Sequence, residues 1–279
     1  MARVSPGNSV YLVIRHSFSG ETDVTITGEV GAWNARGNAA PAVVARGLTK
    51  VYGQGDAAVH ALRGVDVSFE TGAFTAIMGP SGSGKSTLMH CLAGLDAVSG
   101  GKVHIGDVEL TGLNDKQLTL LRRERIGFIF QAFNLLPTLT AEQNIRLPLE
   151  ISGRKADQDL FDRVVETVGL RDRLGHKPTE LSGGQQQRVA VARALISKPQ
   201  VIFADEPTGN LDSRSGAEVL SFLRTSVREL GQTIVMVTHD PVAASYADRV
   251  IFLRDGLLVS ELMRPSPQSV LDTLMKLEA

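Results

Sequence analysis

The sequence predicts an α/β fold whose core is a mainly parallel sheet, with an additional antiparallel sheet formed early in the chain. Two patterns lead to this fold class. After about residue 78, short apolar runs alternate with helical stretches, which is typical of a parallel sheet. Before that point, β-rich runs follow one another with only turns between them, which favours an antiparallel sheet. These early runs cover residues 43–51, 65–69 and 74–78.

The later helices and strands are each predicted from a local pattern. Leu160, Val164 and Val168 recur every four residues, so the segment around them is predicted to be an amphipathic helix. Residues 201–204 are wholly apolar, as expected for a strand buried in a parallel sheet. Gly231 is typical of the residue that ends a helix. On such patterns we expect helices over residues 85–95, 157–168, 185–197 and 213–230, strands over 126–130, 201–204 and 233–237, and a last helix carrying Val270, Leu271, Leu274 and Leu277.

Composition places the chain among average globular proteins. Its 279 residues are 43% hydrophobic and 21% charged, so a large core can form without a disulfide or a structural metal. The net charge of −1 argues against a role in binding nucleic acid. Cys91 is the single cysteine, which excludes an intrachain disulfide and fits a reducing compartment. No apolar run reaches the roughly 18 residues that a membrane-spanning helix needs.

Changes in composition also divide the chain into three parts. Residues 1–40 are rich in Gly, Ser, Thr and Asn, so we expect a poorly ordered extension or an over-long gene start, and no signal peptide. Pro41 marks the boundary to the main domain, which is expected to cover residues 41–264. Pro265 and Pro267 then introduce a C-terminal helix over residues 265–279.

A glycine-rich loop between a predicted strand and a predicted helix carries the first functional signal. It fits the pattern G-x-x-x-x-G-K-[ST] of a phosphate-binding loop, whose glycines let backbone amides and a helix N-terminus surround phosphates. Lys85 adds a full positive charge for the β- and γ-phosphates, and Ser86 offers a hydroxyl to Mg²⁺. Alone, the loop indicates only a P-loop nucleotide-binding protein, a class that includes kinases, GTPases and motor ATPases. The residues expected to bind nucleotide here are Gly79, Pro80, Ser81, Gly82, Ser83, Gly84, Lys85, Ser86 and Thr87.

Two adjacent acids follow the apolar strand at residues 201–204. Asp205 is expected to hold Mg²⁺, directly or through water, because a buried strand usually delivers an aspartate to the nucleotide. Glu206 faces another direction, since successive strand residues alternate sides, and it is expected to accept a proton from the attacking water. The alternative is that both acids merely begin a surface turn before Pro207.

A second glycine-rich sequence, at the start of a predicted helix, points to one family. Its serine, its glycine amides and the helix N-terminus form another anion site. The sequence is Leu181-Ser182-Gly183-Gly184-Gln185, and it resembles the LSGGQ signature of the ABC ATPases. The resemblance covers roughly residues 42–262 and implies a P-loop NTPase core with an α-helical subdomain. It also implies that the second anion site, Ser182, Gly183, Gly184 and Gln185, closes over ATP held by a second copy in a head-to-tail dimer.

The same resemblance implies roles for residues outside the two loops. Gln131 resembles the Q-loop glutamine, which touches Mg²⁺ or the water and senses the membrane subunit. Tyr52 resembles the aromatic residue that stacks on adenine, the alternative being a packed strand residue. Asp212 lies in a sequence that resembles the D-loop at the dimer interface, and His239 resembles the switch histidine that contacts the γ-phosphate. The expected catalytic residues are therefore Glu206, His239, Gln131 and Lys85, and the expected Mg²⁺ ligands are Ser86, Gln131 and Asp205.

Longer stretches are similar to one bacterial subgroup, the LolD, MacB and FtsE type. They cover residues 94–96, 126–137 and 204–212. The similarity implies a cytoplasmic ATPase that is held at the inner face of the cell membrane by a separate integral membrane permease. It implies export or extrusion of macrolides, peptides or lipoproteins, or else mechanical signalling without transport, as in the FtsE type. Residues 133–147 are expected near the permease, although a buried helical subdomain would also suit them.

Two other functional classes fit the sequence less well. A soluble ABC protein of the DNA-repair type needs a long coiled coil, and the short stretch between Lys85 and Ser182 leaves no room for one. The ribosome-acting type carries two cassettes in one chain, whereas one is present here. A P-loop kinase has no use for the sequence at residues 181–185.

Overall fold

Two sheets organise the part of the chain that the computed structural model describes, residues 40–278. The first sheet is antiparallel with strand order β2-β1-β4-β5, and the second has the order β10-β9-β3-β8-β7-β6. The extension expected over residues 1–40 lies, except for residue 40, outside the described residues. The strands are β1 (Val43–Tyr52), β2 (Val59–Phe69), β3 (Phe74–Met78), β4 (Gly100–Ile105), β5 (Val108–Glu109), β6 (Ile126–Phe130), β7 (Val201–Asp205), β8 (Ile234–Val237), β9 (Arg249–Arg254) and β10 (Leu257–Met263).

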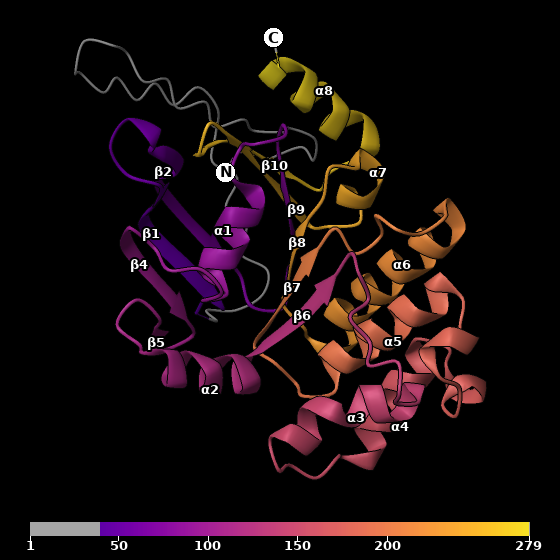
Figure 1. Ribbon diagram of the computed structural model, residues 1–279. Coiled ribbons are helices and arrows are strands. Elements are labelled where there is room, and N and C mark those ends of the chain that lie inside the picture. The colour runs from indigo at the N-terminus through magenta and orange to yellow at the C-terminus, as the bar shows by residue number, and fades with distance from the viewer. Residues whose placement is uncertain (1–39, 279) are drawn as a thin grey trace, which may run out of the picture.

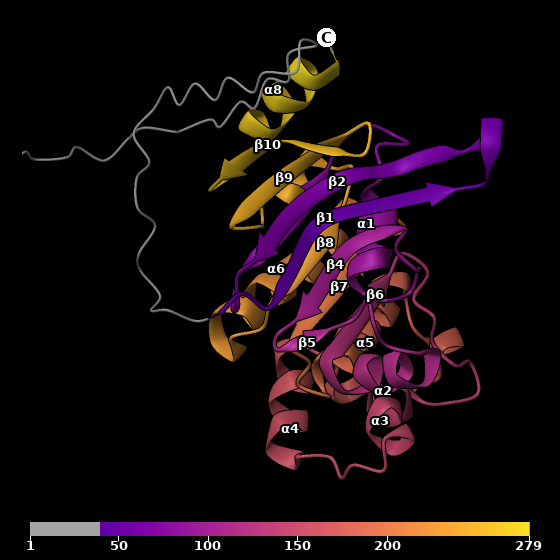
Figure 2. The same ribbon diagram turned by 90° about the vertical axis from the view of Figure 1, so that its left-hand side faces the viewer.

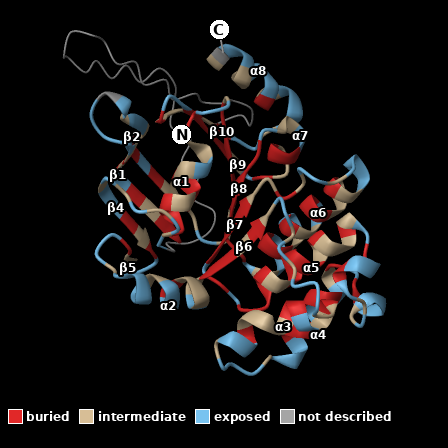
Figure 3. Ribbon diagram, in the orientation of Figure 1, coloured by how far each residue is buried: buried red, intermediate tan, exposed pale blue. Residues whose placement is uncertain are grey.

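The second sheet is mainly parallel, and its central strands are buried on both faces. β3 pairs in parallel with β8 and β9, and β7 pairs in parallel with β6 and β8, while only the edge strand β10 is antiparallel. The expectation that residues 74–78 belong to the early antiparallel sheet is wrong, because β3 lies between β8 and β9 in this sheet. Every residue of β3 and β8 is buried, as the red strands in Figure 3 show. Their continuous apolar composition follows from burial on both faces, where no position faces water.

Helix boundaries are set by local capping chemistry. The Asp157 side chain accepts a hydrogen bond from the Leu160 amide and starts α4, and Gly231, with φ of 66°, ends α6 in the left-handed conformation. The expected helix 85–95 stops earlier because Gly94 turns left-handed at φ of 62°. The helices are α1 (Lys85–Leu92), α2 (Asp115–Arg125), α3 (Ala141–Ile151), α4 (Gln158–Thr167), α5 (Gly183–Leu195), α6 (Ser213–Leu230), α7 (Pro241–Ala244) and α8 (Pro267–Glu278).

The parallel sheet separates two hydrophobic cores. Val201 and Phe203 of β7 face one core, which also contains the buried side of α1 and the antiparallel sheet. Ile202 and Ala204 face the other core, which contains α5 and α6. Figure 1 shows α1 between the two sheets, and both Figure 1 and Figure 2 place α3 and α4 at the opposite end of the molecule from α8. Helices α1 and α5 therefore cover opposite faces of the parallel sheet.

The elements that the sequence patterns did not indicate are short or weakly patterned. They comprise β4, β5, α2, α3, α7, β9 and β10. In α3, Asn144 is fully buried among apolar residues and breaks the hydrophobic pattern. Its side chain accepts a hydrogen bond from the Leu136 amide and donates to the Leu136, Leu139 and Thr140 carbonyls, so it holds the preceding loop in place. Within residues 40–278, none of the helices combines the length and the apolar character that crossing a bilayer demands.

Candidate active site

The expected functional residues gather at the carboxyl ends of four neighbouring parallel strands. β6, β7, β8 and β3 lie side by side in the sheet. Each is followed by a segment singled out in the sequence: Gln131 after β6, Glu206 after β7, His239 after β8 and the P-loop after β3. In open α/β sheets the carboxyl ends of the strands form the ligand-binding edge. The sheet order therefore brings together residues that lie more than 150 positions apart.

The P-loop has the shape of a phosphate cradle. A Cβ atom at Gly79 would lie 2.0 Å from the Leu253 carbonyl oxygen, and one at Gly84 would lie 2.5 Å from the Ala61 carbonyl oxygen, so no larger residue fits at either position. Gly84 caps α1 without a side-chain hydrogen bond, which leaves first-turn amides free for an anion. The buried Ser83 hydroxyl has no partner among the described residues. These observations fit a nucleotide phosphate at this loop.

The Lys85 ammonium lies inside the cradle. It donates hydrogen bonds to the carbonyl oxygens of Gly79 at 3.0 Å and Pro80 at 2.8 Å. Burial lowers the pKa of Lys85, and the carboxylates of Glu206 and Asp205 oppose that shift. Among the described residues no carboxylate forms an ion pair with Lys85, so this half-buried cation is well suited to attract an anionic ligand.

Asp205 and Glu206 point to different partners, but strand alternation is not the reason, because β7 ends at Asp205 and Glu206 has a left-handed backbone. The Asp205 carboxylate lies 4.0 Å from Nε2 of His90 on α1. Burial raises the pKa of Asp205 and Glu206 raises it further, whereas His90 and Lys85 act in the opposite direction. A bound divalent cation would favour the ionised form of this carboxylate, as expected of a metal ligand. The interpretation of the two acids as a plain surface turn does not explain this environment.

Glu206 and His239 form a close pair. Oε2 of Glu206 lies 2.8 Å from Nδ1 of His239, whose side chain is 72% exposed. Glu206 has φ of 46°, a left-handed backbone that is costly for a residue with a Cβ. Its amide donates to the Val237 carbonyl at 2.9 Å, which fixes this conformation against β8. Strained backbone of this kind is found most often at functional sites, and here it carries a carboxylate that contacts a histidine at the end of a strand.

Tyr52 lies on the surface near the P-loop. The residue is 41% exposed, so it is not a packed core residue. The hydroxyl donates to the Asp96 carboxylate at 2.5 Å and is also hydrogen-bonded to Thr87 at the start of α1. Nζ of Lys50 lies 4.6 Å from the ring centroid and contacts Asp96 at 2.6 Å. The ring is thus fixed beside the P-loop helix with part of its surface open to a ligand.

The signature sequence forms a separate site at the start of α5. The Ser182 hydroxyl accepts from the Gln185 amide at 3.2 Å, and the Gln185 side chain accepts from the Ser182 amide at 2.9 Å, a reciprocal capping box. A Cβ at Gly184 would meet the Ser215 side chain at 2.8 Å, so this glycine also permits close packing of α5 against α6. The Asp212 side chain caps α6 by accepting from the Arg214 and Ser215 amides.

Two residues near the site were not singled out by sequence patterns. His90 approaches Asp205, and Gln187 joins two loops of the site. Gln187 carried a usable signal, because it follows Gly184 by three residues on the buried face of α5, where a polar side chain is unusual. His90 gave none, since its partner is remote in sequence. Asn210 belongs to the stretch 210–212 that resembles the D-loop, but the sequence did not predict its contact with Gln131.

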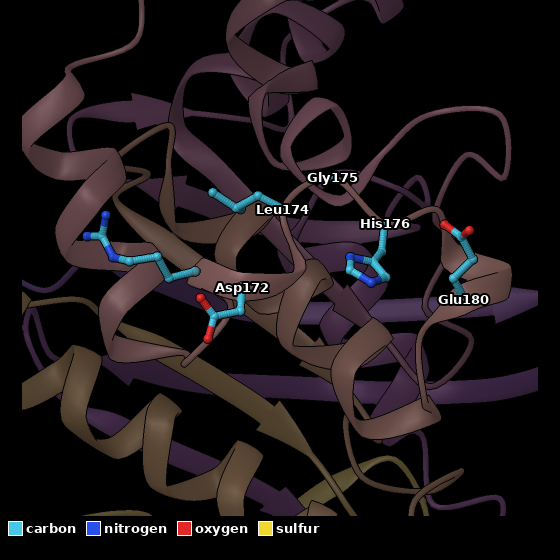
Figure 4. A pocket seen from close by; sticks show the side chains of 6 residues that line it. Asp172, Leu174, Gly175, His176 and Glu180 are labelled. Carbon is cyan, nitrogen blue, oxygen red and sulfur yellow. The ribbon is translucent and has the colours of Figure 1, made fainter.

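A surface hollow of about 470 Å³ lies before the signature sequence (Figure 4). None of its lining residues belongs to the expected nucleotide site, and their side chains are mostly charged and exposed. They are Arg171, Asp172, Leu174, Gly175, His176 and Glu180.

Comparison with known families then decides the classification. The family model described as ABC transporter matches residues 62–209, which include the P-loop, the signature and both strand-end acids. The chain belongs to this family. It is an ABC ATPase, the ATP-binding component of an ABC transporter, and the match covers more than half of its length.

Relatives of two lengths match the chain. It is 45% identical over 236 residues to the bacitracin export ATP-binding protein BceA of Halalkalibacterium halodurans, with 83% of this chain and 93% of that protein covered. It is 49% identical over 216 residues to the macrolide export ATP-binding/permease protein MacB of Bdellovibrio bacteriovorus. That match covers 77% of this chain but 33% of MacB, so the chain spans about a third of the MacB length.

Solved structures share the fold over most of the chain. A dimeric structure of the ATP-binding cassette MJ0796, described as a post-hydrolysis state bound to ADP and Pi, superposes with a TM-score of 0.71 at 40% identity. It covers 80% of this chain and 99% of that one. The structure of cbiO1 from Clostridium perfringens, described as part of the ABC transporter complex cbiONQ, gives a TM-score of 0.72 at 28% identity and covers 83% of this chain and 91% of that one. These neighbours confirm the predicted α/β ABC ATPase fold.

Proposed function

We propose that this ABC ATPase hydrolyses Mg-ATP as a head-to-tail dimer and drives export through a separate membrane-spanning permease. The observation that carries the catalytic part is the meeting of Lys85, Asp205, Glu206 and His239 at one edge of the parallel sheet, with the Glu206 carboxylate 2.8 Å from His239. Electrostatic positioning of this kind supplies most of the catalysis in phosphoryl transfer.

Each residue of the site has a role in this proposal. Lys85 neutralises charge on the β- and γ-phosphates, and Ser86, Gln131 and Asp205 hold Mg²⁺. The metal, when bound, offsets negative charge on the phosphate oxygens. Glu206 takes a proton from the attacking water. His239 orients the Glu206 carboxylate through Nδ1 and contacts the γ-phosphate from its exposed side, while Tyr52 stacks on adenine.

The dimer is supported by the separation of the two anion sites. α1 and α5 cover opposite faces of the parallel sheet, so Ser182 and the P-loop of one chain do not converge on one phosphate group. The solved MJ0796 cassettes are described as dimeric, and one of them holds ADP and Pi. In our proposal Ser182 to Gln185 close over the nucleotide of the second copy, with Asp212 at the interface.

Coupling to a permease is supported by the names of the relatives. BceA is described as an export ATP-binding protein, and MacB is described as an export ATP-binding/permease protein. Both names refer to export. Residues 133–147, with Leu136 at 46% exposure, form the proposed contact with the permease at the inner face of the membrane.

The test of the proposal is Glu206→Gln. The change keeps the shape of the side chain but removes the base, so we expect ATP hydrolysis to fall by roughly 10²–10⁴-fold. Because ATP then persists, the variant should elute as a dimer on a sizing column with ATP and as a monomer without it. Unchanged hydrolysis would remove Glu206 from the proposed role.

The same variant tests the partner. Purified with ATP from native membranes in mild detergent, it should retain an integral membrane protein, which mass spectrometry would identify. Lys85→Ala, which loses the phosphate contact, is the matched control and should retain less of that protein. Recovery of ribosomal or DNA-repair proteins in its place would refute the transport proposal and leave the ATPase activity standing.

A further inference from the structure

Two side chains of α5 hold the loop that follows β6. Nε2 of Gln187 donates to the Phe130 carbonyl at 3.2 Å. The guanidinium of Arg193 donates to the Phe133 carbonyl at 3.0 Å and to the Asn134 carbonyl at 2.6 Å. Gln187 is fully buried and also donates to the Pro207 carbonyl, just after the acids of β7. The backbone on both sides of Gln131 is therefore fixed to the signature helix.

Gln131 itself is held by Asn210, which lies 79 residues later. Nδ2 of Asn210 donates to the Gln131 backbone carbonyl at 3.0 Å, and Oδ1 of Asn210 accepts from Nε2 of Gln131 at 3.1 Å. The two amides thus form a reciprocal pair. A Cβ atom at Gly209 would lie 2.8 Å from Nε2 of Gln131, so the glycine lets the two segments approach this closely.

This pair determines which atom of the Gln131 amide remains available. A backbone carbonyl only accepts hydrogen bonds, so the Asn210 atom facing it must be the NH₂ group. The Asn210 oxygen then faces the Gln131 side chain, and only the Gln131 NH₂ group satisfies it. Oε1 of Gln131 is consequently turned away from Asn210. An amide oxygen binds Mg²⁺ or accepts from a water, whereas an amide NH₂ group does not ligate a cation.

We infer that Asn210 is a positioning residue that orients the Gln131 amide so that its oxygen faces the Mg²⁺ site. The inference rests on the proposed function, because Gln131 is a proposed metal ligand. Without Asn210 the amide of the exposed Gln131 side chain rotates freely and presents its oxygen for only part of the time. Asn210 therefore acts on the metal through Gln131 alone.

A double-mutant cycle tests the inference. Asn210→Ala, Gln131→Ala and the double variant are compared by kcat at saturating Mg-ATP. They are also compared by Mn²⁺ affinity of the ATP-loaded chain, measured by EPR in the Glu206→Gln background to prevent turnover. Asn210→Ala should lower kcat and weaken Mn²⁺ binding by about tenfold, equivalent to about 1.4 kcal/mol, with little change in KM for ATP. In the Gln131→Ala background, Asn210→Ala should change kcat and Mn²⁺ affinity by less than about twofold.

Two further variants separate orientation from folding. Asn114→Ala removes the N-cap of α2, remote from the site, so it should lower stability and leave kcat and Mn²⁺ affinity unchanged. Asn210→Asp keeps an oxygen that accepts from Gln131, so it should retain more Mn²⁺ affinity than Asn210→Ala. The inference would be overturned if Asn210→Ala lowered kcat and Mn²⁺ affinity equally in the presence and absence of Gln131, or if it lowered neither. The proposed function would still stand in that case, provided that the wild-type chain hydrolyses ATP. A wild-type chain that binds no Mn-ATP would overturn both.

Discussion

Glu206 illustrates how one residue combines strain with function. Its left-handed backbone costs about 1–2 kcal/mol relative to an extended one. The conformation persists because the amide is bonded to β8 and the next residue, Pro207, is buried. With this backbone the Glu206 carboxylate lies 2.8 Å from Nδ1 of His239, whereas the Asp205 carboxylate lies 4.0 Å from Nε2 of His90. Two adjacent acids thereby serve different partners.

Cys91 shows the opposite case, a reactive group made inert by packing. It lies on α1 between the sheets with 2% of its surface exposed, and burial raises the pKa of its thiol to about 11. The thiolate is the reactive form, so a thiol with this pKa reacts slowly at neutral pH.

We therefore predict that iodoacetamide labels native Cys91 at pH 8 about 100-fold more slowly than it labels the chain unfolded in urea. Mass spectrometry of timed samples measures both rates. Because the folded pKa lies above the working pH, native labelling should accelerate about tenfold for each unit of pH between 8 and 10. Similar rates for native and unfolded chains would show that Cys91 is accessible in solution.

At the scale of the element, α6 shows that both ends of a helix are determined by single residues. Asp212 caps the N-terminus through its carboxylate, and Gly231 ends the helix with φ of 66°. The Gly231 amide donates to the Ser226 carbonyl, so an otherwise unpaired carbonyl of the last turn is satisfied. A Cβ atom at Gly231 would meet nothing within 4 Å, so any cost of a larger residue there is conformational and not steric.

Gly231→Ala should therefore lower the free energy of unfolding by about 1 kcal/mol, because alanine resists the left-handed conformation. Urea denaturation followed by circular dichroism measures the change. Gly112→Ala is the matched control, since a Cβ there also meets nothing within 4 Å but the backbone is not left-handed. Equal stabilities of the two variants would contradict the conformational explanation.

At the scale of the whole molecule, the parallel sheet divides the chain functionally. The P-loop leads into α1 on one face of the parallel sheet, and the signature sequence begins α5 on the other face. In the proposed dimer, each chain thus supplies two half-sites. The P-loop of one chain is completed by the signature of the second copy, and the reverse. A symmetric dimer contains two such composite sites.

Mixing two inactive variants tests this arrangement. Lys85→Ala removes the P-loop cation, and Ser182→Arg blocks the signature, so each homodimer should be inactive. A mixed dimer contains one site with both defects and one intact site. Half of the dimers in an equal mixture are mixed, so we expect about a quarter of the wild-type ATPase rate. No recovery in a mixture shown to contain mixed dimers would exclude the head-to-tail arrangement.

The sequence by itself determined the elements whose signals are local. Residues 213–230 were predicted as a helix with its true bounds because Gly231 follows it, and β3 and β6 were predicted with theirs because their apolar runs end at loop residues. The P-loop and signature were recognisable because their chemistry requires adjacent residues. Short strands such as β5 were not predicted because so few residues carry no clear alternation, and α3 was not predicted because its buried Asn144 interrupts the apolar pattern.

Only the tertiary structure decided how these pieces meet. The strand order β3-β8-β7-β6 places Gln131, Glu206 and His239 at one edge, and no local pattern encodes that order. Packing between remote segments also decides three contacts or placements. It pairs Gln131 with Asn210, brings His90 near Asp205, and puts α1 and α5 on opposite faces of the sheet. Residue identity and local spacing specify which chemistry is possible, whereas the direction of each side chain is settled by the sheet that carries it.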